Sequence, residues 1–284
     1  MIAAIGVIVG TMALFIVLSG FSGLKTFSLN FLQASDPDFK ITAIKGKTID
    51  FTDDLKSKIE STEGIAHYTN VIEERAFFEF KNKTHLAYIK GVEENYTNIS
   101  NIDSSLSVGS WLYKEFENTA VIGRGISNKL SLGILNYGAP LKIMVPKPGK
   151  GFINPRNPFY KIETQIVGVY MGTEDFENKF VFTSIDQARA LLRFKENQIS
   201  AIEIKLNDSN TAANVAESLS DALGDAFKVQ TKAQLNEVFY KVINTENFVS
   251  YLIFTLIVII ALFNVIGAII MMIIDKKQNL KTLF

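Results

Sequence analysis

The chain has 284 residues, with 29 basic and 29 acidic side chains, 48% hydrophobic residues and no cysteine. The balanced charge gives no indication of a nucleic-acid-binding surface, and the lack of cysteine excludes disulfides and thiolate metal sites. With His67 and His85 as its only histidines, the chain is not expected to hold a multi-histidine metal centre. We therefore expect a protein of one or two domains without a metal or another cofactor.

The first apolar stretch, residues 1–24, contains no charged side chain. Gly6 and Gly10 are separated by about one helical turn, which predicts a narrow face on which a second helix can pack closely. The alternative is a cleaved signal peptide, which would need a basic start and a small-residue cleavage site. Neither is evident, so we interpret this stretch as a retained transmembrane helix.

Residues 25–247 have the composition of a soluble domain. Two groups of elements share the order strand, helix, strand: residues 39–45, 53–62, 68–80 and 85–92 in the first group, and 201–206, 211–223 and 226–230 in the second. Strand–helix–strand units with antiparallel partners predict an α+β fold with helices on one sheet. The recurrence also raises the question of a structural repeat.

The segment at about residues 104–195 differs from both groups because it consists mainly of short β segments. We expect strands at residues 120–122, 141–145, 161–170 and 179–183, followed by a helix at 184–193. This pattern predicts a β-rich subdomain inserted into the α/β part.

A loop at residues 145–161 contains four of the six prolines of the chain and four basic residues, but no acidic residue. Proline lacks an amide hydrogen and restricts φ, so the loop cannot be a central strand or a helix. One interpretation is a solvated surface loop. The other is a protrusion that docks a partner, since long ordered loops are often functional. The candidate docking residues are Lys147, Pro148, Phe152, Pro155, Arg156, Pro158 and Phe159.

The second apolar stretch, residues 248–274, has no charged side chain and is long enough to cross a bilayer as a helix. It contains one amide, Asn264, on the same helical face as Ala268; such a face either packs on another helix or contacts a substrate. The basic residues that follow predict a cytoplasmic C-terminus. Two spans then place residues 25–247 outside. A helix that starts at Thr231 is expected to continue without interruption into this span.

Two motifs resemble nucleotide-binding loops but lack the required spacing. Residues 46–48 (Gly-Lys-Thr) have no glycine at the upstream position and predict a turn, whereas residues 123–125 (Gly-Arg-Gly) predict the start of a helix. The acids Glu73, Glu74 and Glu79 are expected to face solvent. We find no catalytic constellation, which favours a protein that is not an enzyme.

Two stretches of the sequence carry a resemblance. ALFNVIGAIIMMIIDKKQNLKTL, which includes Ala261, Phe263, Asn264, Asp275 and Lys276, resembles the second span of permeases in the LolC/LolE family, within a superfamily that includes MacB and FtsX. IGVIVGTMALFIVLSGFSGLK and the later DPDFKI are similar to the first span and to the start of the periplasmic domain of that family. Gln278 and Asn279 are less typical, and the basic segment that usually precedes the first span is missing.

The resemblance implies a multi-pass protein of the bacterial inner membrane, with transmembrane helices at residues 1–24 and 248–274 on either side of a MacB-like periplasmic core. It implies a permease of an ABC transporter that releases lipoproteins, with four spans, so that two spans would follow this chain. The implied partners are a separate ATPase subunit, a second permease copy or paralogue, membrane lipid, the lipoprotein substrate and a periplasmic lipoprotein carrier.

Two contacts follow from the same resemblance. In that family a hairpin at the position of the proline-rich loop hooks the carrier. Residues 275–284 would begin a segment that couples to the ATPase through Asp275, Lys276, Lys277, Leu280 and Lys281. Two alternatives remain open: a MacB- or FtsX-like permease that transmits motion without moving lipoproteins, and a two-span sensor with a ligand-binding outer domain.

Overall fold

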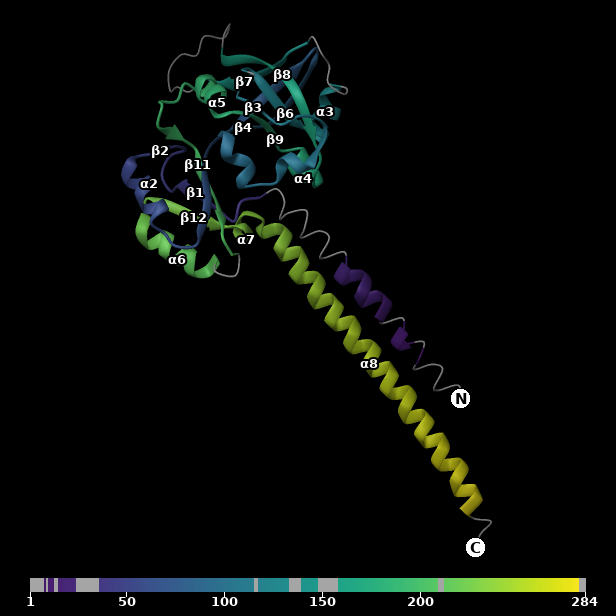
Figure 1. Ribbon diagram of the computed structural model, residues 1–284. Coiled ribbons are helices and arrows are strands. Elements are labelled where there is room, and N and C mark those ends of the chain that lie inside the picture. The colour runs from purple at the N-terminus through teal and green to yellow at the C-terminus, as the bar shows by residue number, and fades with distance from the viewer. Residues whose placement is uncertain are drawn as a thin grey trace. The chain divides into compact units, whose positions relative to one another are not determined.

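The computed structural model of the protein describes residues 8, 10–12, 15–23, 36–114, 117–132, 139–147, 158–208 and 212–280 (Figure 1). Its internal contacts divide the chain into two units. Phe31–Leu235 form one unit, which we call the sheet domain. Met1–Asn30 and Asn236–Phe284 form the other, which we call the helical unit.

The strands of the sheet domain are β1 (Phe39–Ala43), β2 (Ile49–Asp50), β3 (Ile65–Phe80), β4 (Lys83–Val92), β5 (Leu106–Gly109), β6 (Thr119–Gly123), β7 (Leu141–Pro146), β8 (Phe159–Tyr170), β9 (Phe180–Ser184), β10 (Gln198–Ile199), β11 (Ala201–Leu206) and β12 (Phe227–Thr231). Its helices are α2 (Asp53–Glu60), η1 (Glu94–Asn98), η2 (Ile102–Ser105), α3 (Arg124–Leu130), α4 (Glu174–Glu177), α5 (Ile185–Leu192), α6 (Ala212–Leu223) and α7 (Lys232–Leu235). These bounds confirm the strands and helices predicted within both groups and within the β-rich segment, to within a few residues.

Local signals determine where the helices begin and end. The Thr52 side chain accepts a hydrogen bond from the Leu55 amide at the start of α2, and Ser184 caps α5 in the same way. Gly64 and Gly224 follow α2 and α6 with φ values of 95° and 70°, a left-handed conformation that glycine adopts at little cost. These caps explain why the helix positions could be read from the sequence.

The ten strands of the main sheet are arranged in the order β12-β1-β11-β3-β4-β9-β6-β8-β5, and β7 pairs with both β3 and β8. The additional pairings of β7 close a ring of six hydrogen-bonded strands, β3-β4-β9-β6-β8-β7 (Figure 1). Strand β3 makes this possible because it has 16 residues. Its first half pairs with β11 and its second half with β7 along the same edge.

The β-rich segment therefore supplies β5 to β9 to the same sheet that contains β1, β11 and β12. The limits of this segment as a separate subdomain, residues 104–195, stay a prediction. Helices α2 and α6 lie next to each other at the end of the sheet formed by β1, β11 and β12 (Figure 1). A large apolar core, which includes Phe39, Ile59 and Leu219, joins these helices to the sheet.

The other face of the sheet carries a smaller, aromatic core. Tyr96 from η1 and Tyr170 from β8 are fully buried there beside Phe182 of β9. The Tyr170 hydroxyl donates to a main-chain carbonyl oxygen, that of Phe180, at 2.8 Å. The polar tip of this buried ring is therefore satisfied inside the domain.

The prediction of one continuous helix from Thr231 into the second span is wrong at its start. Thr231 still belongs to β12, where it pairs with Phe39, and the short helix α7 ends at Leu235. Thr231 nevertheless forms a capping box with Gln234, because the Gln234 amide donates to the Thr231 hydroxyl and the Thr231 amide donates to the Gln234 side chain. A new helix, α8, begins at Glu237 and continues to Leu280.

Within the helical unit, α8 contains the residues Ser250–Ile274, with a mean hydropathy of 3.0. Over the part of the chain that the structure describes, this is the one helix with the length and apolar composition to cross a membrane. A shorter apolar helix covers Gly10–Gly23. The second span is thus supported by α8, and the first span stays a prediction.

Candidate functional site

The proline-rich loop connects β7 to β8, and both of its ends are anchored in the sheet. Pro146 pairs with Phe159 at the end of the two strands, and the Lys147 amide donates to the Pro158 carbonyl oxygen at 2.9 Å. The Phe159 ring meets Phe77 of β3 edge to face, with 5.7 Å between the ring centroids. The loop is therefore the tip of a β-hairpin whose base is fixed to β3.

The base of the hairpin carries positive charge around an aromatic ring. Two cations lie close to the Tyr160 ring: the Lys147 Nζ is 5.5 Å and the Arg193 Cζ is 4.2 Å from its centroid. Phe159 and Tyr160 are half-buried because β8 begins with them. Pro148, Phe152, Pro155 and Arg156 lie outside the described residues, so docking by this loop stays a prediction.

The structure describes three of the four residues that are predicted to pack the two spans against other helices. Asn264 is exposed on α8 while Ala268, on the same face, is half-buried. A Cβ built on Gly10 would meet no described atom within 4 Å, and Gly6 lies outside the described residues. The small-residue face of residues 1–24 and the amide of α8 therefore remain candidates for packing against further helices.

The candidate coupling segment continues the membrane helix instead of forming a separate helix. Asp275, Lys276 and Lys277 are helical residues of α8, which ends at Leu280, and both lysines are exposed. The side chains of Asp275 and Leu280 and the whole of Lys281 are outside the described part. The contact of this segment with an ATPase stays a prediction.

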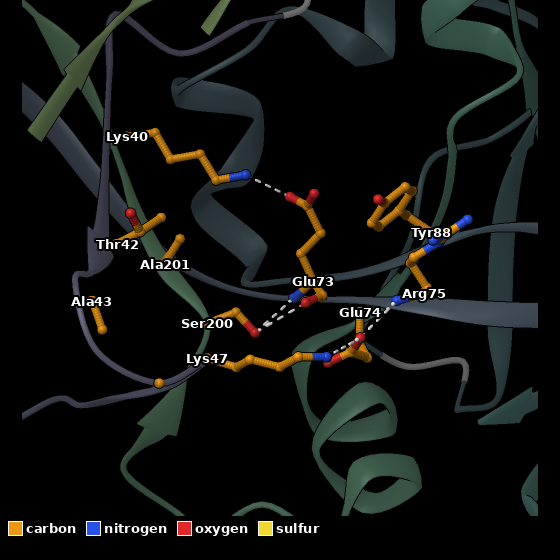
Figure 2. Close-up of a pocket in the computed structure, with 11 residues that line it drawn as sticks. Lys40, Thr42, Ala43, Lys47, Glu73, Glu74, Arg75, Tyr88, Ser200 and Ala201 are labelled. Atoms are coloured by element: carbon orange, nitrogen blue, oxygen red, sulfur yellow. Dashed lines mark hydrogen bonds and ion pairs between the residues drawn. The ribbon is translucent and has the colours of Figure 1, made fainter. Parts of the chain in front are cut away.

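A buried network of charges in the sheet domain was missed in the sequence. The carboxylate of Glu73, expected to face solvent, accepts a hydrogen bond from the Lys40 ammonium at 2.6 Å, and 15% of its side chain is exposed (Figure 2). The Ser200 hydroxyl contacts the Glu73 backbone, so that β3 is held to the start of β11. The expectation for Glu73 is wrong, because strands on both sides of β3 enclose its position.

Glu74 and Glu79 are also paired, although nearer the surface. Glu74 accepts from Lys47 at 3.0 Å across the pocket shown in Figure 2, and Glu79 lies 3.4 Å from Lys142 of β7. This pocket has a volume of about 340 Å³. Because the acids around it are already occupied by lysines, the pocket holds internal ion pairs and offers little free charge to a ligand.

The most deeply buried ion pair joins Lys90 of β4 to Glu203 of β11. Its atoms are 2.8 Å apart, and the side chains are 4% and 1% exposed. The Lys90 ammonium also lies 5.0 Å from the ring centroid of Tyr96 and 5.1 Å from that of Phe180. A desolvated cation enclosed by one carboxylate and aromatic rings is held in place by both interactions.

The network changes the ionisation of its members. Burial opposes the charge on Glu73, but the nearby ammonium groups of Lys40 and Lys90 outweigh this effect and hold the pKa of Glu73 below its ordinary value. Burial lowers the pKa of Lys179, and the attraction of Glu73 only partly opposes this shift. Acid that protonates Glu73 would therefore remove the charge of the carboxylate to which Lys40 donates.

Asp38 joins the first strand of the sheet domain to its last helix. One of its carboxylate oxygens accepts from the Leu206 amide at 2.9 Å, at the position where the pairing of β11 with β3 shifts register. The other lies 3.9 Å from Lys232 of α7, and the Lys232 amide donates to the Asp38 carbonyl oxygen. The aspartate of the DPDFKI stretch thus holds β1, β11 and α7 together.

A signal for these residues does exist in the sequence. Lys40 and Glu203 each lie between two apolar residues of a strand, and Glu73 and Lys90 each follow an isoleucine. Charged residues almost never become fully buried without a partner, so opposite charges in central strands indicate internal pairs. Which lysine meets which carboxylate depends on strand order, which the sequence does not reveal.

Comparison with known proteins shows the class of the chain. The model of the family described as MacB-like periplasmic core domain matches residues 1–222. The chain therefore belongs to this family, and its resemblance to permeases of the LolC/LolE type is confirmed.

Two relatives named as transmembrane proteins of lipoprotein-releasing systems are similar over nearly the whole chain. LolE of Haemophilus influenzae is 23% identical over 283 residues, which cover 98% of this chain and 67% of the relative. LolC of Neisseria meningitidis is 23% identical over 290 residues, which cover 100% of this chain and 68% of the relative. The chain thus spans about two thirds of the length of these proteins.

Among solved structures, the periplasmic region of MacB from Actinobacillus actinomycetemcomitans is similar to 71% of this chain and 92% of that chain. The TM-score is 0.47 and the sequence identity is 12%.

Proposed function

We propose that this chain is a permease subunit of an ABC transporter that releases lipoproteins from the bacterial inner membrane. The sheet domain would lie on the periplasmic side, and a separate ATPase subunit would hydrolyse ATP on the cytoplasmic side. The observation that carries the proposal is the extent of the similarity to LolE and LolC, which includes both the sheet domain and α8. The chain itself would perform no catalysis.

The energetics of lipid anchors explain why such a process needs ATP. Each buried CH₂ group of an acyl chain contributes about 0.8 kcal/mol, so that several long chains hold a lipoprotein by roughly tens of kcal/mol. Spontaneous escape is negligible on this scale. The permease would work together with a second permease copy or paralogue and would pass the lipid to a periplasmic carrier that shields it from water.

The β7–β8 hairpin is the proposed docking point for that carrier. Its base is rigid, because Phe159 packs on Phe77 and Lys147 is bonded to Pro158. A rigid base reduces the entropy lost on binding. Lys147 and Arg193 beside Tyr160 would attract an acidic surface of the carrier.

The proposal is tested in proteoliposomes that contain the full-length permease, its ATPase and a radiolabelled lipoprotein. We expect ATP-dependent transfer of the lipoprotein to added carrier. In a second arm, residues 148–157 are replaced by four Gly-Ser residues, which retains the Lys147–Pro158 closure. This variant should keep its ATPase activity and its melting temperature, but it should lose most transfer.

A matched control replaces the β3–β4 turn, Lys81-Asn82, by Asn-Gly. Lys81 has a φ of 52°, which asparagine tolerates, so transfer should be unchanged. Unimpaired transfer in the hairpin variant would contradict carrier docking. ATPase coupling without any transfer would favour a MacB- or FtsX-like permease, and failure to bind an ATPase would favour the two-span sensor.

A further inference from the structure

The chain passes between the helical unit and the sheet domain at two places. The first is between Asn30 and Phe31, before β1, and the second is between Leu235 and Asn236, after α7. Strand β1 and strand β12, which directly precedes α7, are hydrogen-bonded neighbours at one end of the sheet (Figure 1). The two connections to the helical unit therefore belong to one pair of strands.

The pairing of β1 with β12 begins where the two connections leave the sheet. Phe39 is opposite Thr231, and the antiparallel ladder continues to Ala43 opposite Phe227. β12 is the last strand in the order of the main sheet, so within the described residues of that sheet only β1 pairs with it. A force that separates the connections would act on the open end of this ladder. Its hydrogen bonds would then break one after another instead of all together.

Asp38 closes the open end of the ladder. Its carbonyl oxygen accepts a hydrogen bond from the Lys232 amide at 2.9 Å, and its carboxylate lies 3.9 Å from the Lys232 ammonium. On its other side, the carboxylate accepts from the Leu206 amide and the Asp38 amide donates to the Ile204 carbonyl oxygen, both at 2.9 Å. One residue thus binds the exit of the chain and the neighbouring strand β11 at the same time.

The contact between Asp38 and Lys232 is partly shielded from water. Their side chains are 11% and 15% exposed, so solvent screens the attraction less than at the surface. Burial lowers the pKa of Lys232, and the Asp38 carboxylate opposes this shift. Lys205 lies 3.5 Å from the same carboxylate, but it belongs to β11 and is 35% exposed. Of the two lysines, only Lys232 connects Asp38 to the exit of the chain.

Helix α7 follows the movement of β12 because the two are joined by more than the chain. The Thr231 amide donates to the Gln234 side chain at 2.9 Å, and the Gln234 amide donates to the Thr231 hydroxyl at 3.3 Å. This capping box satisfies main-chain groups at the start of α7. A pull on the chain beyond Leu235 would therefore reach β12 and the Asp38–Lys232 contact together.

We propose that Asp38 is a positioning residue that clamps the two connections together, so that a displacement of the helical unit moves the sheet domain as one body instead of peeling β12 from β1. The inference rests on the proposed function, in which ATP is hydrolysed on the side of the membrane opposite to the sheet domain. Asp38 would act through β12 and α7. Without this clamp, part of each displacement would open the ladder and would not reach the rest of the sheet.

The first measurement is hydrogen exchange of the full-length permease with its ATPase in nanodiscs, without ATP. Asp38→Ala should speed exchange of the β12 amides and of the Lys232 amide about tenfold, because loss of a hydrogen bond to a charged group shifts local opening by about this factor. Lys232→Met keeps the Leu206 bond and should speed the same amides about threefold, so it replaces Asp38→Ala if that variant does not fold.

The matched control is Lys205→Met. It removes the other lysine next to Asp38 but leaves α7 attached, so exchange in β12 should change less than about twofold. Comparison of Lys232→Met with Lys205→Met therefore separates the exit of the chain from the general charge around Asp38.

The second measurement is the ratio of lipoprotein transferred to ATP hydrolysed in the proteoliposomes described above. Asp38→Ala and Lys232→Met should still hydrolyse ATP but should lower this ratio several-fold, in the order in which they speed exchange. Lys205→Met should keep the ratio of the unsubstituted protein. A residue that only stabilises the fold would change the amount of active complex, but it would not change the ratio.

Faster exchange in β12 with an unchanged ratio would overturn the proposal, because the contact would then only stabilise the strand. Unchanged exchange in both Asp38→Ala and Lys232→Met would also overturn it, as would equal losses in Lys232→Met and Lys205→Met. These outcomes would leave the proposed function intact. Absence of ATP-dependent transfer by the unsubstituted complex would instead refute the proposed function, and this inference with it.

Discussion

At the scale of single residues, the pair Lys90–Glu203 stands apart from the other ion pairs of the sheet domain. Both side chains are almost completely buried, whereas Lys47 in the pair with Glu74 is 78% exposed. A buried ion pair stabilises the fold little more than an apolar pair of the same shape. Removal of one partner is nevertheless costly, because it leaves a desolvated charge without its counter-charge. Exposed ion pairs contribute little to stability, so removal of one partner costs little.

We therefore predict that Glu203→Gln lowers the free energy of unfolding by about 3 kcal/mol, because Lys90 loses its counter-charge inside the domain. Lys47→Gln, which breaks the exposed pair, should cost less than about 1 kcal/mol. Urea unfolding of the full chain in detergent, followed by Trp111 emission, measures both values.

The double variant Lys90→Met with Glu203→Leu provides the matched control. It removes both charges together, so most of the stability lost in Glu203→Gln should return. A small loss in Glu203→Gln, or a double variant as unstable as the single one, would show that the buried charges are not coupled.

At the scale of elements, α8 is longer than a bilayer requires. Its 44 residues extend over about 66 Å at 1.5 Å per residue, whereas the hydrocarbon core needs about 20 residues. The apolar part ends at Ile274, and the helix continues with Asp275, Lys276 and Lys277. The start of the segment proposed to couple to the ATPase is thus a helical extension of the span.

We predict that this extension seats in an apolar groove of the ATPase through Leu280. In the full-length permease, Leu280→Asp should abolish co-purification of the ATPase and transport, because burial of an unpaired carboxylate costs several kcal/mol. Lys277→Ala, at an exposed position on the same helix, should have little effect. If Leu280→Asp retains the ATPase and full transport, the segment only fixes the topology.

At the scale of the whole molecule, the orientation in the membrane decides which partners can reach which surface. The two apolar stretches and the basic tail predict that the sheet domain is outside and that both termini are cytoplasmic. Only in this orientation can the hairpin meet a periplasmic carrier while the end of α8 meets an ATPase.

Cysteine labelling tests this orientation without background, since the chain has no cysteine. Ser61→Cys, at an exposed position after α2, should react with an impermeant maleimide in intact spheroplasts. Thr282→Cys should react only after the membrane is permeabilised. The unsubstituted chain serves as the control, and the opposite labelling pattern would refute the orientation.

The sequence could predict the features that depend on neighbouring residues. The uncharged run of residues 248–274 indicated the membrane helix, and the helix expected at residues 53–62 agrees with α2, which Thr52 caps. The same local reasoning failed at Thr231, where the capping pattern is real but starts only a short helix. There, pairing of Thr231 with Phe39 in β12 decides where the strand ends.

What the sequence by itself determined was the set of elements, the apolar span and the family resemblance, because hydrophobicity, caps and turns act within a few residues. Only the tertiary structure decided that β7 closes a ring onto β3 and that Glu73 is enclosed. Lys90 and Glu203 are 113 residues apart in the chain and meet only because β4 and β11 flank β3. Strand order depends on the total burial and hydrogen bonding of the sheet, which no local stretch of sequence contains.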